Sequence, residues 1–515
     1  MWLSRLFLLF LLLVPVVASA QMELTDVRAV VRQAAARAKE ISPDSFIAVV
    51  DREGYVLGVW ATGLVPANPA VRKQAIAAAV SKAGTAAFLS STEEALTSRT
   101  AGFIVQQHFP PGVDNRPPGP LVGVNFSSLP FSDVNFFKNP LTFKPRPGKL
   151  SGPGGTNGTP VSGTSLAGSP GGVPLYKNGL LIGGIGVTGD GSENIQVAQR
   201  ADVDEDIALA GQRGFEPRDE ILGSKVFIDG IRIPYVNSST ALGPLPPLAS
   251  LGKALLAFPL TNSPSVTYGK VTLGGVTGEV RNRVRSDPKA DLIHGQPRLT
   301  AAEVAGILSR AARQASRTRA GIRLPRGKAA QVFISVVSNP NAPGEKPEIL
   351  GTFRTPDATI FSWDVAVQKA RTAVFFSNNQ RAFSTRTVSF LAQSLYPPGI
   401  NDTTPGPFLG LQERFSGFTG FNVLNGVSVT TPPAMLPPNP NLPNGITIFP
   451  GGFPLYRNGV LIGAIGVSGD GVDQDDLISA AGTVGFQPPE AIRADTKMYR
   501  GARLPYAKFP RNPEL

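Results

Sequence analysis

Apolar residues recur at helical spacing near the start of each half of the chain. In the first half, the segment 24–38 has one apolar face, formed by Leu24, Val27, Val30 and Val31. In the second half, a similar pattern follows Thr300, which has the spacing of a capping box with Glu303. Residues three or four positions apart lie on the same face of a helix. We therefore predict an amphipathic helix at both places.

Short apolar runs follow these helices and predict β-hairpins. In each case two apolar runs are separated by a turn, and one of the turns contains Asn178-Gly179, the strongest short-range signal of a hairpin. The paired runs are 46–50 with 55–61, 173–176 with 180–187, and 332–337 with 348–353.

A long helix is predicted between the hairpins of the first half. The segment 70–89 consists largely of alanine, valine, lysine and glutamine and contains no proline, which gives it high helix propensity. Ser91 and Glu94 then have the spacing of a capping box and predict the start of another helix. Because hairpins connect the strands, and not strand–helix–strand crossovers, we expect antiparallel sheets with helices packed against them. This is an α+β fold.

The two halves share sequence in three blocks that occur in the same order. The first block runs without a gap from Lys82 to Pro110 and returns from Lys369 to Pro397. The second is GGVPLYKNGLLIGGIGVTGDG, which returns as GGFPLYRNGVLIGAIGVSGDG, and the third is G-x-R-x-P-Y. Repeated blocks at changing distances indicate a duplicated domain whose loops differ in length. We predict a first repeat at 21–236 with a glycine- and proline-rich insertion at about 140–170, a linker at 237–297, and a second repeat at 298–515.

Residues 1–20 have the features of a secretory signal peptide. Arg5 is followed by an apolar run and by Ala18-Ser19-Ala20, a small-residue cleavage pattern. We expect an exported protein, periplasmic or secreted, with no transmembrane segment after cleavage. The chain contains no cysteine. It therefore forms no disulfide, and the fold has to be stabilised by its hydrophobic core.

The formal net charge of +12 is spread along the chain. Proteins that bind nucleic acids concentrate their basic residues on one face or helix, and no run of five basic residues occurs here. We expect no nucleic-acid partner, and only a mild attraction for anionic ligands or surfaces.

The residue types that the repeats lack exclude most catalytic and metal-binding arrangements. Of the two histidines, His108 corresponds to Leu395 in the second repeat, and His294 lies in the predicted linker. A Ser-His-Asp triad or a paired-histidine zinc site therefore cannot occur in both repeats. The glycine motif at 184–189 lies inside a predicted hairpin strand, so it favours close packing over a dinucleotide site. We expect a binding protein more than an enzyme, and no metal site.

A few polar residues occur in both repeats and define the candidate site. Lys82 and Thr85 match Lys369 and Thr372, and a lysine and a threonine three positions apart share one helix face. With the small alanines beside them, they suit a flat, anionic ligand. A structural role is equally open, since the lysine could extend to solvent and the threonine could bond its own backbone.

These motifs resemble those of the GlcG/HbpS family of haem-binding domains. The pattern is K-A-x-T-A on a helix, then G-G-x-P-L-Y-x-N-G-x-L-I-G-x-I-G-V, then an acidic start to a helix. The resemblance covers about residues 22–235 and 298–506. It implies an antiparallel sheet flanked by helices, in a layer arrangement like that of profilin and PAS domains, and domains that associate with copies of themselves. Two fused copies would form an intramolecular pseudo-dimer that could stack further.

The resemblance also implies haem, or a similar tetrapyrrole, as the ligand. In the family the iron contact is attributed to the threonine of the K-A-x-T helix, which maps onto Thr85 and Thr372, and Lys82 and Lys369 would meet a propionate. We add His108 as a candidate of the first repeat alone. The implied function is haem scavenging, storage or sensing, and haem breakdown also occurs in the family. The alternative is an envelope interaction or signalling module that binds a protein partner and no small ligand.

Overall fold

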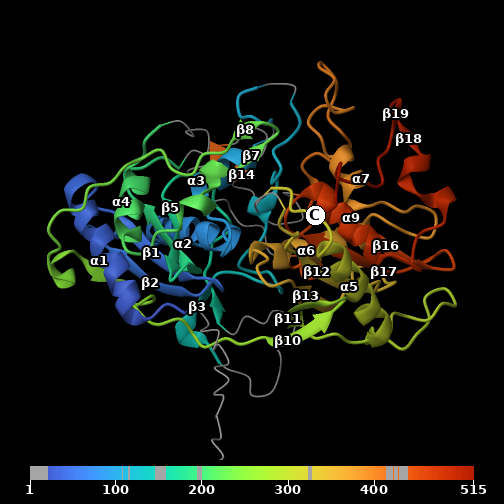
Figure 1. Ribbon diagram of the computed structural model, residues 1–515, viewed down its shortest axis with the longest axis horizontal. Coiled ribbons are helices and arrows are strands. Elements are labelled where there is room, and N and C mark those ends of the chain that lie inside the picture. The colour runs from blue at the N-terminus through green and yellow to red at the C-terminus, as the bar shows by residue number, and fades with distance from the viewer. Residues whose placement is uncertain are drawn as a thin grey trace, which may run out of the picture.

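Two antiparallel sheets with helices on both faces make up the described part of the chain, which confirms the α+β prediction (Figure 1). The computed structural model describes residues 21–106, 108–113, 116–144, 158–193, 200–322, 327–412, 421–422, 427–428 and 439–515. The predicted signal peptide and part of the predicted insertion lie outside these residues.

The first sheet has the strand order β5-β6-β1-β2-β9, and every neighbouring pair is antiparallel. Both predicted hairpins of the first repeat lie in it, as β1–β2 and β5–β6. Its strands are β1 (Phe46–Asp51), β2 (Val56–Ala61), β5 (Gly172–Lys177), β6 (Leu180–Thr188) and β9 (Lys253–Ala254).

The second sheet repeats this arrangement, with the order β16-β17-β12-β13-β11-β10. The pairing registers also agree, since Phe46 pairs with Thr188 in the first sheet and Phe333 pairs with Ser468 in the second. The strands are β10 (Gly269–Leu273), β11 (Val276–Asn282), β12 (Phe333–Ser338), β13 (Ile349–Arg354), β16 (Gly452–Arg457) and β17 (Val460–Ser468).

Helices cover both faces of each sheet. In the first repeat, α1 (Leu24–Ile41) and α4 (Val203–Gln212) pack on one face and α2 (Pro69–Leu89) on the other. In the second repeat, α5 (Ala301–Ala315) and α9 (Val472–Gly482) correspond to the first pair, and α6 (Phe361–Phe375) corresponds to α2. Figure 1 shows α2 and α6 toward the middle of the molecule, between the two sheets.

Shorter elements complete the described residues. Two short helices, α3 (Ser98–Ile104) and α7 (Thr385–Leu391), follow α2 and α6. The two-stranded ribbons are β3 (Lys138–Asn139) with β4 (Thr159–Pro160), β7 (Phe227–Ile228) with β8 (Ile231–Arg232), β14 (Phe421–Asn422) with β15 (Val427–Ser428), and β18 (Met498–Tyr499) with β19 (Ala502–Arg503).

Helix starts follow the sequence signals in part. Thr300 and Glu303 form the predicted capping box of α5. The start of α3 was predicted at Ser91, but its N-cap is Thr97, whose hydroxyl accepts the N–H of Thr100. Ser91 instead belongs to a turn closed by the bond from its N–H to the carbonyl of Glu94, because both residues suit turns as well as caps.

The segment 237–297, predicted as a linker, contributes strands to both sheets. β9 pairs with β2 at the edge of the first sheet, and β11 pairs with β13 at the same edge of the second. The segment that connects the two repeats is therefore anchored to each sheet by backbone hydrogen bonds.

The repeats meet along a continuous hydrophobic cluster, which we call the seam. It contains residues of α2, of the loop 121–137 and of α6, among them Ala83, Phe137 and Val367. Polar contacts cross the seam as well. Arg371 of α6 donates to both carboxylate oxygens of Asp133, at 2.8 Å each.

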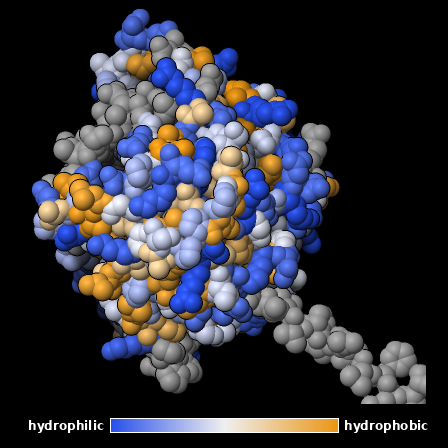
Figure 2. Space-filling view, turned by 90° about the vertical axis from the view of Figure 1, so that its left-hand side faces the viewer, coloured by the Kyte–Doolittle hydropathy of each residue, from blue (hydrophilic) through white to orange (hydrophobic). Residues whose placement is uncertain are grey.

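The outer face of the first repeat differs from the seam. The side of the molecule that carries α1 shows hydrophilic and hydrophobic residues interspersed (Figure 2). The apolar positions predicted for this helix, such as Val27 and Val31, are fully buried against the sheet. This is the pattern of an amphipathic helix that covers a core.

A buried carboxyl group lies at the seam. Asp364 of α6 is 1% exposed and accepts hydrogen bonds from the Ser128 N–H (2.9 Å) and the Ser132 hydroxyl (2.5 Å). Burial raises its pKa to about 7, against the lowering effect of these two bonds; nearby Asp133 raises it further and Arg371 lowers it. Since the folded pKa exceeds the ordinary value of about 3.9, the folded state binds more protons between pH 4 and 7.

We therefore predict that Asp364 makes the protein less stable as the pH rises from 5 to 7. Asp364→Asn keeps the shape and a hydrogen-bond acceptor but cannot ionise. Over this range the wild type should lose about 2–3 kcal/mol more unfolding free energy than the variant. Urea denaturation of both proteins at pH 5, 6 and 7 measures the difference. If the unfolding free energies of the wild type and Asp364→Asn changed with pH by the same amount, the pKa of Asp364 would be an ordinary one.

Candidate functional site

Close contact between a glycine-rich strand and a helix positions the candidate residues. A Cβ atom on Gly186 of β6 would lie 2.2 Å from the Ala79 carbonyl oxygen of α2, and one on Gly466 of β17 would lie 2.0 Å from that of Ala366 in α6. The glycines thus allow helix and strand backbones to touch. This supports the packing interpretation of the glycine motif, because Gly186 lies within a strand and not in a turn that opens a helix.

Lys82 of α2 is fully buried in a cluster of charges. Its Nζ donates to Asp204 Oδ2 of α4 at 2.9 Å and to Glu193 Oε1 at 2.7 Å. Burial lowers the pKa of the ammonium, but the two carboxylates outweigh it and hold the pKa above its ordinary value. Lys82 is a charged group in the interior of the protein.

Lys369 occupies the same position on α6. Its Nζ donates to Asp475 Oδ2 of α9 at 2.8 Å and to the carbonyl oxygen of Val467 at 2.7 Å. The ammonium also lies 5.8 Å from the centre of the Phe449 ring. Asp475 therefore corresponds to Asp204, while the second partner of the lysine differs between the repeats.

The two threonines have matching structural contacts. Thr85 is fully buried; its hydroxyl donates to the Ser81 carbonyl at 2.8 Å and accepts the Ala167 N–H at 2.7 Å. The hydroxyl of Thr372, also fully buried, accepts the Thr447 N–H at 3.1 Å. Each hydroxyl fixes the chain that leads into the glycine-rich hairpin.

His108 lies apart from these residues. It is partly exposed in the turn that follows α3, and its Nδ1 lies 3.0 Å from the Arg116 carbonyl oxygen. The structure brings each lysine together with an acidic residue of the following helix, but the described contacts do not include His108 in that group.

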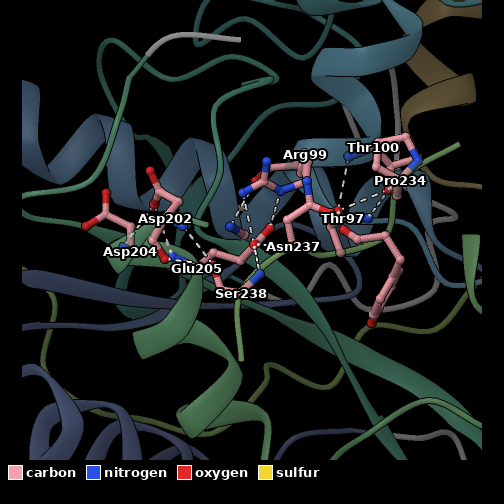
Figure 3. A network of polar contacts seen from close by, with 12 residues as sticks. Thr97, Arg99, Thr100, Asp202, Asp204, Glu205, Pro234, Asn237 and Ser238 are labelled. Atoms are coloured by element: carbon pink, nitrogen blue, oxygen red, sulfur yellow. Dashed lines mark hydrogen bonds and ion pairs between the residues drawn. The ribbon is translucent and has the colours of Figure 1, made fainter. Parts of the chain in front are cut away.

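Sequence reasoning missed the acidic partners. Asp202 is the N-cap of α4, and its side chain accepts the N–H groups of Asp204 and Glu205. Asp204 then pairs with Lys82. Glu205 pairs with Arg99 through two bonds of 2.6 and 2.9 Å (Figure 3). The signal was present in the sequence, because two adjacent acidic residues start the corresponding helix of both repeats.

The polar residues shared by the two repeats make equivalent contacts. Arg386 binds Asp476 as Arg99 binds Glu205. Tyr176 donates to the carbonyls of Ser91 and Glu94, and Tyr456 donates to the corresponding carbonyls of Asn378 and Arg381. Much of the shared sequence is therefore explained by the architecture that both repeats need.

A small hollow of about 10 Å³, room for about one water molecule, opens beside Lys369 at the seam. Lys369 and Asp475 supply its charged groups, and most of its wall is apolar. The apolar side chains include Phe361, Val365, Phe449 and Val472 of the second repeat and Leu121 of the first. Neither Thr372 nor His108 lines it. An ammonium at the edge of an apolar hollow suits a ligand with an anionic group on an apolar body.

The described residues hold neither a metal site nor a helical membrane span. These contain no group of three or more His, Cys, Asp and Glu side chains placed to hold a metal ion. None of the helices in the described ranges combines the length and the hydropathy that a membrane span requires.

Comparison with known proteins gives a family match within the second repeat. Residues 326–483 match the family model described as haem degrading protein HbpS-like. No curated protein matches the chain. Similar solved structures include PduOC in complex with heme (22% identity, 37% of this chain and 96% of that chain, TM-score 0.23) and the protein ORFY of Klebsiella pneumoniae (20%, 38% and 94%, 0.24). A double mutant of HbpS from Streptomyces reticuli is also similar (18%, 39% and 96%, 0.22).

Proposed function

Because residues 326–483 carry an HbpS-like domain, we propose that this protein binds haem or a similar tetrapyrrole. The observation that supports this best is the hollow in that same segment, where the Lys369 ammonium lies at the edge of an apolar wall. We further propose that the chain is exported through its N-terminal signal and serves in haem scavenging, storage or sensing, with the two repeats as an intramolecular pseudo-dimer that can stack further.

The residues at the hollow fit part of a haem molecule. A haem has a flat apolar body and two propionates, which match the aromatic and aliphatic wall and the ammonium of Lys369. The volume of about 10 Å³ holds about one water molecule and is far below the roughly 300–1,000 Å³ of sites that enclose a small molecule. The hollow therefore has room for a carboxylate oxygen beside Lys369, and the macrocycle would lie outside it.

The chain's own residues would supply binding and orientation. Lys369, held by Asp475, would attract a propionate, while Phe361 and Phe449 would cover the apolar edge and keep water from it. Bound haem would supply a redox-active iron. None of the described residues that line the hollow is a histidine, methionine or tyrosine, the usual protein ligands of haem iron besides cysteine, so we derive no step at the iron.

Thr85 and Thr372 remain candidates for the iron contact through the family resemblance alone. In the structure both hydroxyls bond the protein backbone and are fully buried. A contact with iron would require the segments around Ala167 and Thr447 to move away. The double variant Thr85→Val/Thr372→Val tests this role. Unchanged haem affinity would show that both threonines have a structural role and do not contact the iron.

We predict that Lys369→Met weakens hemin binding about ten- to hundredfold, because a charge-assisted contact with a propionate is lost. Titration of hemin into the mature protein, followed by the Soret absorbance, measures the affinity. The double variant Lys369→Met/Asp475→Asn removes both charges of the ion pair and separates lost binding from lost folding. Lys270→Met, at an exposed position of β10, removes the same charge and should leave the affinity unchanged.

The second candidate function is an interaction module without a small ligand. It is favoured by the contacts of Lys82 and Thr85, which the chain's own groups already satisfy. A mature protein that stays colourless with hemin, and that retains a defined envelope protein on an affinity column, would support this function over haem binding.

A further inference from the structure

Each repeat carries a two-stranded ribbon that presents the same kind of side-chain pair to solvent. In β7–β8, Phe227 pairs across the strands with Arg232, and in β18–β19 Met498 pairs with Arg503. The shared G-x-R-x-P-Y block places the two pairs at corresponding positions. Phe227 is 54% exposed and Met498 is 63% exposed, and both arginines are exposed as well.

Other positions of the ribbons attach them to the protein. Ile228 and Ile233 are buried in the first repeat, and Leu504 is buried in the second. The turns Asp229-Gly230 and Arg500-Gly501 have positive φ at both residues, as tight two-residue hairpins require. Packing therefore accounts for the ribbons but not for the bulky apolar side chain that each repeat exposes at the same position. We read this repeated feature as part of a contact surface.

A turn near the second ribbon enlarges its apolar surface. Ile400 is exposed, and so is Val113 at the corresponding position of the first repeat, after the shared Pro-Pro-Gly. The turn contacts the ribbon directly, because Arg500 Nη1 donates to Thr404 Oγ1 and to the Pro405 carbonyl oxygen, at 2.9 Å each. Ile400 and Met498 thus belong to two segments that hold each other in place.

Positive charge accompanies these apolar residues. The segment 497–503 contains the exposed Lys497, Arg500 and Arg503 and no acidic residue. The adjoining turn adds one exposed carboxylate, Asp402. In the first ribbon Asp229 stands in the place of Arg500, so the positive charge is concentrated on the second. Two copies of the chain that met at this ribbon would bring like charges together, whereas an anionic partner would be attracted.

The two ribbons lie on one side of the molecule. Figure 1 shows both β7–β8 and β18–β19 on the upper side, above the helices α2 and α6. A flat partner can therefore meet both ribbons at once. An anionic bilayer is such a partner, because it has negative headgroups at its surface and accepts apolar side chains just beneath them.

We propose that the ribbons β7–β8 and β18–β19 dock the protein on an anionic phospholipid bilayer. Phe227 and Met498 would enter the boundary between headgroups and acyl chains, and Lys497, Arg500 and Arg503 would contact the phosphate groups. The second ribbon would supply most of the attraction, because it carries most of the charge. This inference goes beyond haem binding and does not depend on it.

Co-sedimentation with lipid vesicles tests the inference. The mature full chain is mixed with vesicles of phosphatidylcholine and phosphatidylglycerol in equal parts, or of phosphatidylcholine alone. We expect binding to the mixed vesicles only, and weaker binding as the salt concentration rises. Lys497→Gln/Arg503→Gln should weaken this binding about ten- to thirtyfold, since two basic contacts with the anionic surface are lost.

Lys270→Gln/Arg283→Gln is the matched control, because it also removes one exposed lysine and one exposed arginine. Lys270 lies in β10 and Arg283 directly follows β11, and Figure 1 shows these strands on the lower side, away from the ribbons. The control should bind the mixed vesicles as the wild type does. Urea unfolding of each variant shows whether the fold is retained.

A fluorescent probe at the ribbon tests the apolar contact separately. In Met498→Trp, brominated phospholipids in the mixed vesicles should quench the added fluorescence, because they quench an indole ring that reaches the acyl chains. Vesicle binding without this quenching would contradict insertion of the ribbon.

Three further results would overturn the inference. The first is no binding to the mixed vesicles. The second is an equal loss in Lys497→Gln/Arg503→Gln and in the control, which would assign the binding to net charge. The third is a wild type that ignores vesicles but self-associates in analytical ultracentrifugation, with Met498→Ser remaining monomeric, which would assign the ribbon to contacts between copies. The hemin titration is independent of all three, so the proposed function and this inference can fail separately.

Discussion

Arg99→Met should lower the unfolding free energy of the first repeat by about 3–5 kcal/mol, because it leaves the buried carboxylate of Glu205 without its cation. Both side chains are 1% exposed and are joined by two charge-assisted hydrogen bonds. Glu205 Oε2 also accepts the N–H groups of Asn237 and Ser238, at 2.9 Å each (Figure 3). These donors lie at the start of the segment 237–297, so Arg99→Met should also weaken the contact of this segment with α4.

The corresponding arginine of the second repeat is the control. Arg386 is 13% exposed and contacts Asp473, which is 21% exposed, as well as the buried Asp476. Water can reach part of this cluster, so Arg386→Met should cost roughly half as much. Trp60 lies in the first repeat and Trp363 in the second, so fluorescence during urea unfolding in the single-tryptophan backgrounds Trp363→Phe and Trp60→Phe measures each repeat separately. If Arg99→Met and Arg386→Met lost the same unfolding free energy, burial of the ion pair would not determine the size of that loss.

Gly186→Ala should destabilise the protein by at least about 3 kcal/mol, at the upper end of the cost of overpacking. The added methyl group would lie 2.2 Å from the Ala79 carbonyl oxygen and 2.3 Å from the Ala83 nitrogen. Both atoms belong to the backbone of α2, so no side chain can turn aside and the helix has to move from the sheet. That movement would also displace Lys82 and Thr85. Thermal and urea unfolding measure the loss.

Gly306 provides the matched control for this substitution. It lies within α5, and the nearest atom to an added Cβ is the end of the flexible Arg310 side chain at 3.4 Å. Gly306→Ala should therefore stabilise the protein by about 0.5–1 kcal/mol, through helix propensity. If both variants had the same unfolding midpoint, the close contact of β6 with α2 would not be a determinant of stability.

The elements that local patterns specify were predicted well. The hairpins around 51–54 and Asn178-Gly179 and the long helix α2 depend on residues near in sequence, and the structure has all three. The strands of 237–297 were missed: β9 is an edge strand only two residues long, and β11 lies between β10 and β13 in its sheet. Their formation depends on the neighbouring strands β2 and β13, which lie far away in the sequence.

The structure places the predicted site residues on the expected helices, but their contacts differ from those expected of residues that share one ligand. Lys82 and Thr85 share a helix, as expected, but they do not face one ligand, since the lysine binds carboxylates and the threonine binds the backbone. Helical spacing places a side chain on a face and does not say what covers that face. The partners Asp204 and Glu193 come from segments more than a hundred residues away.

The seam between the repeats has a consequence for how such a protein can change. In a dimer of identical chains, an isologous interface carries the same residues on both sides, so every substitution appears twice. Here both sides belong to one chain, and they differ: Asp364 and Arg371 on α6 stand where α2 has Ala77 and Gly84. A substitution on one side of the seam can therefore be compensated by a different substitution on the other side. One repeat can then acquire a specialised role while the other keeps a structural role.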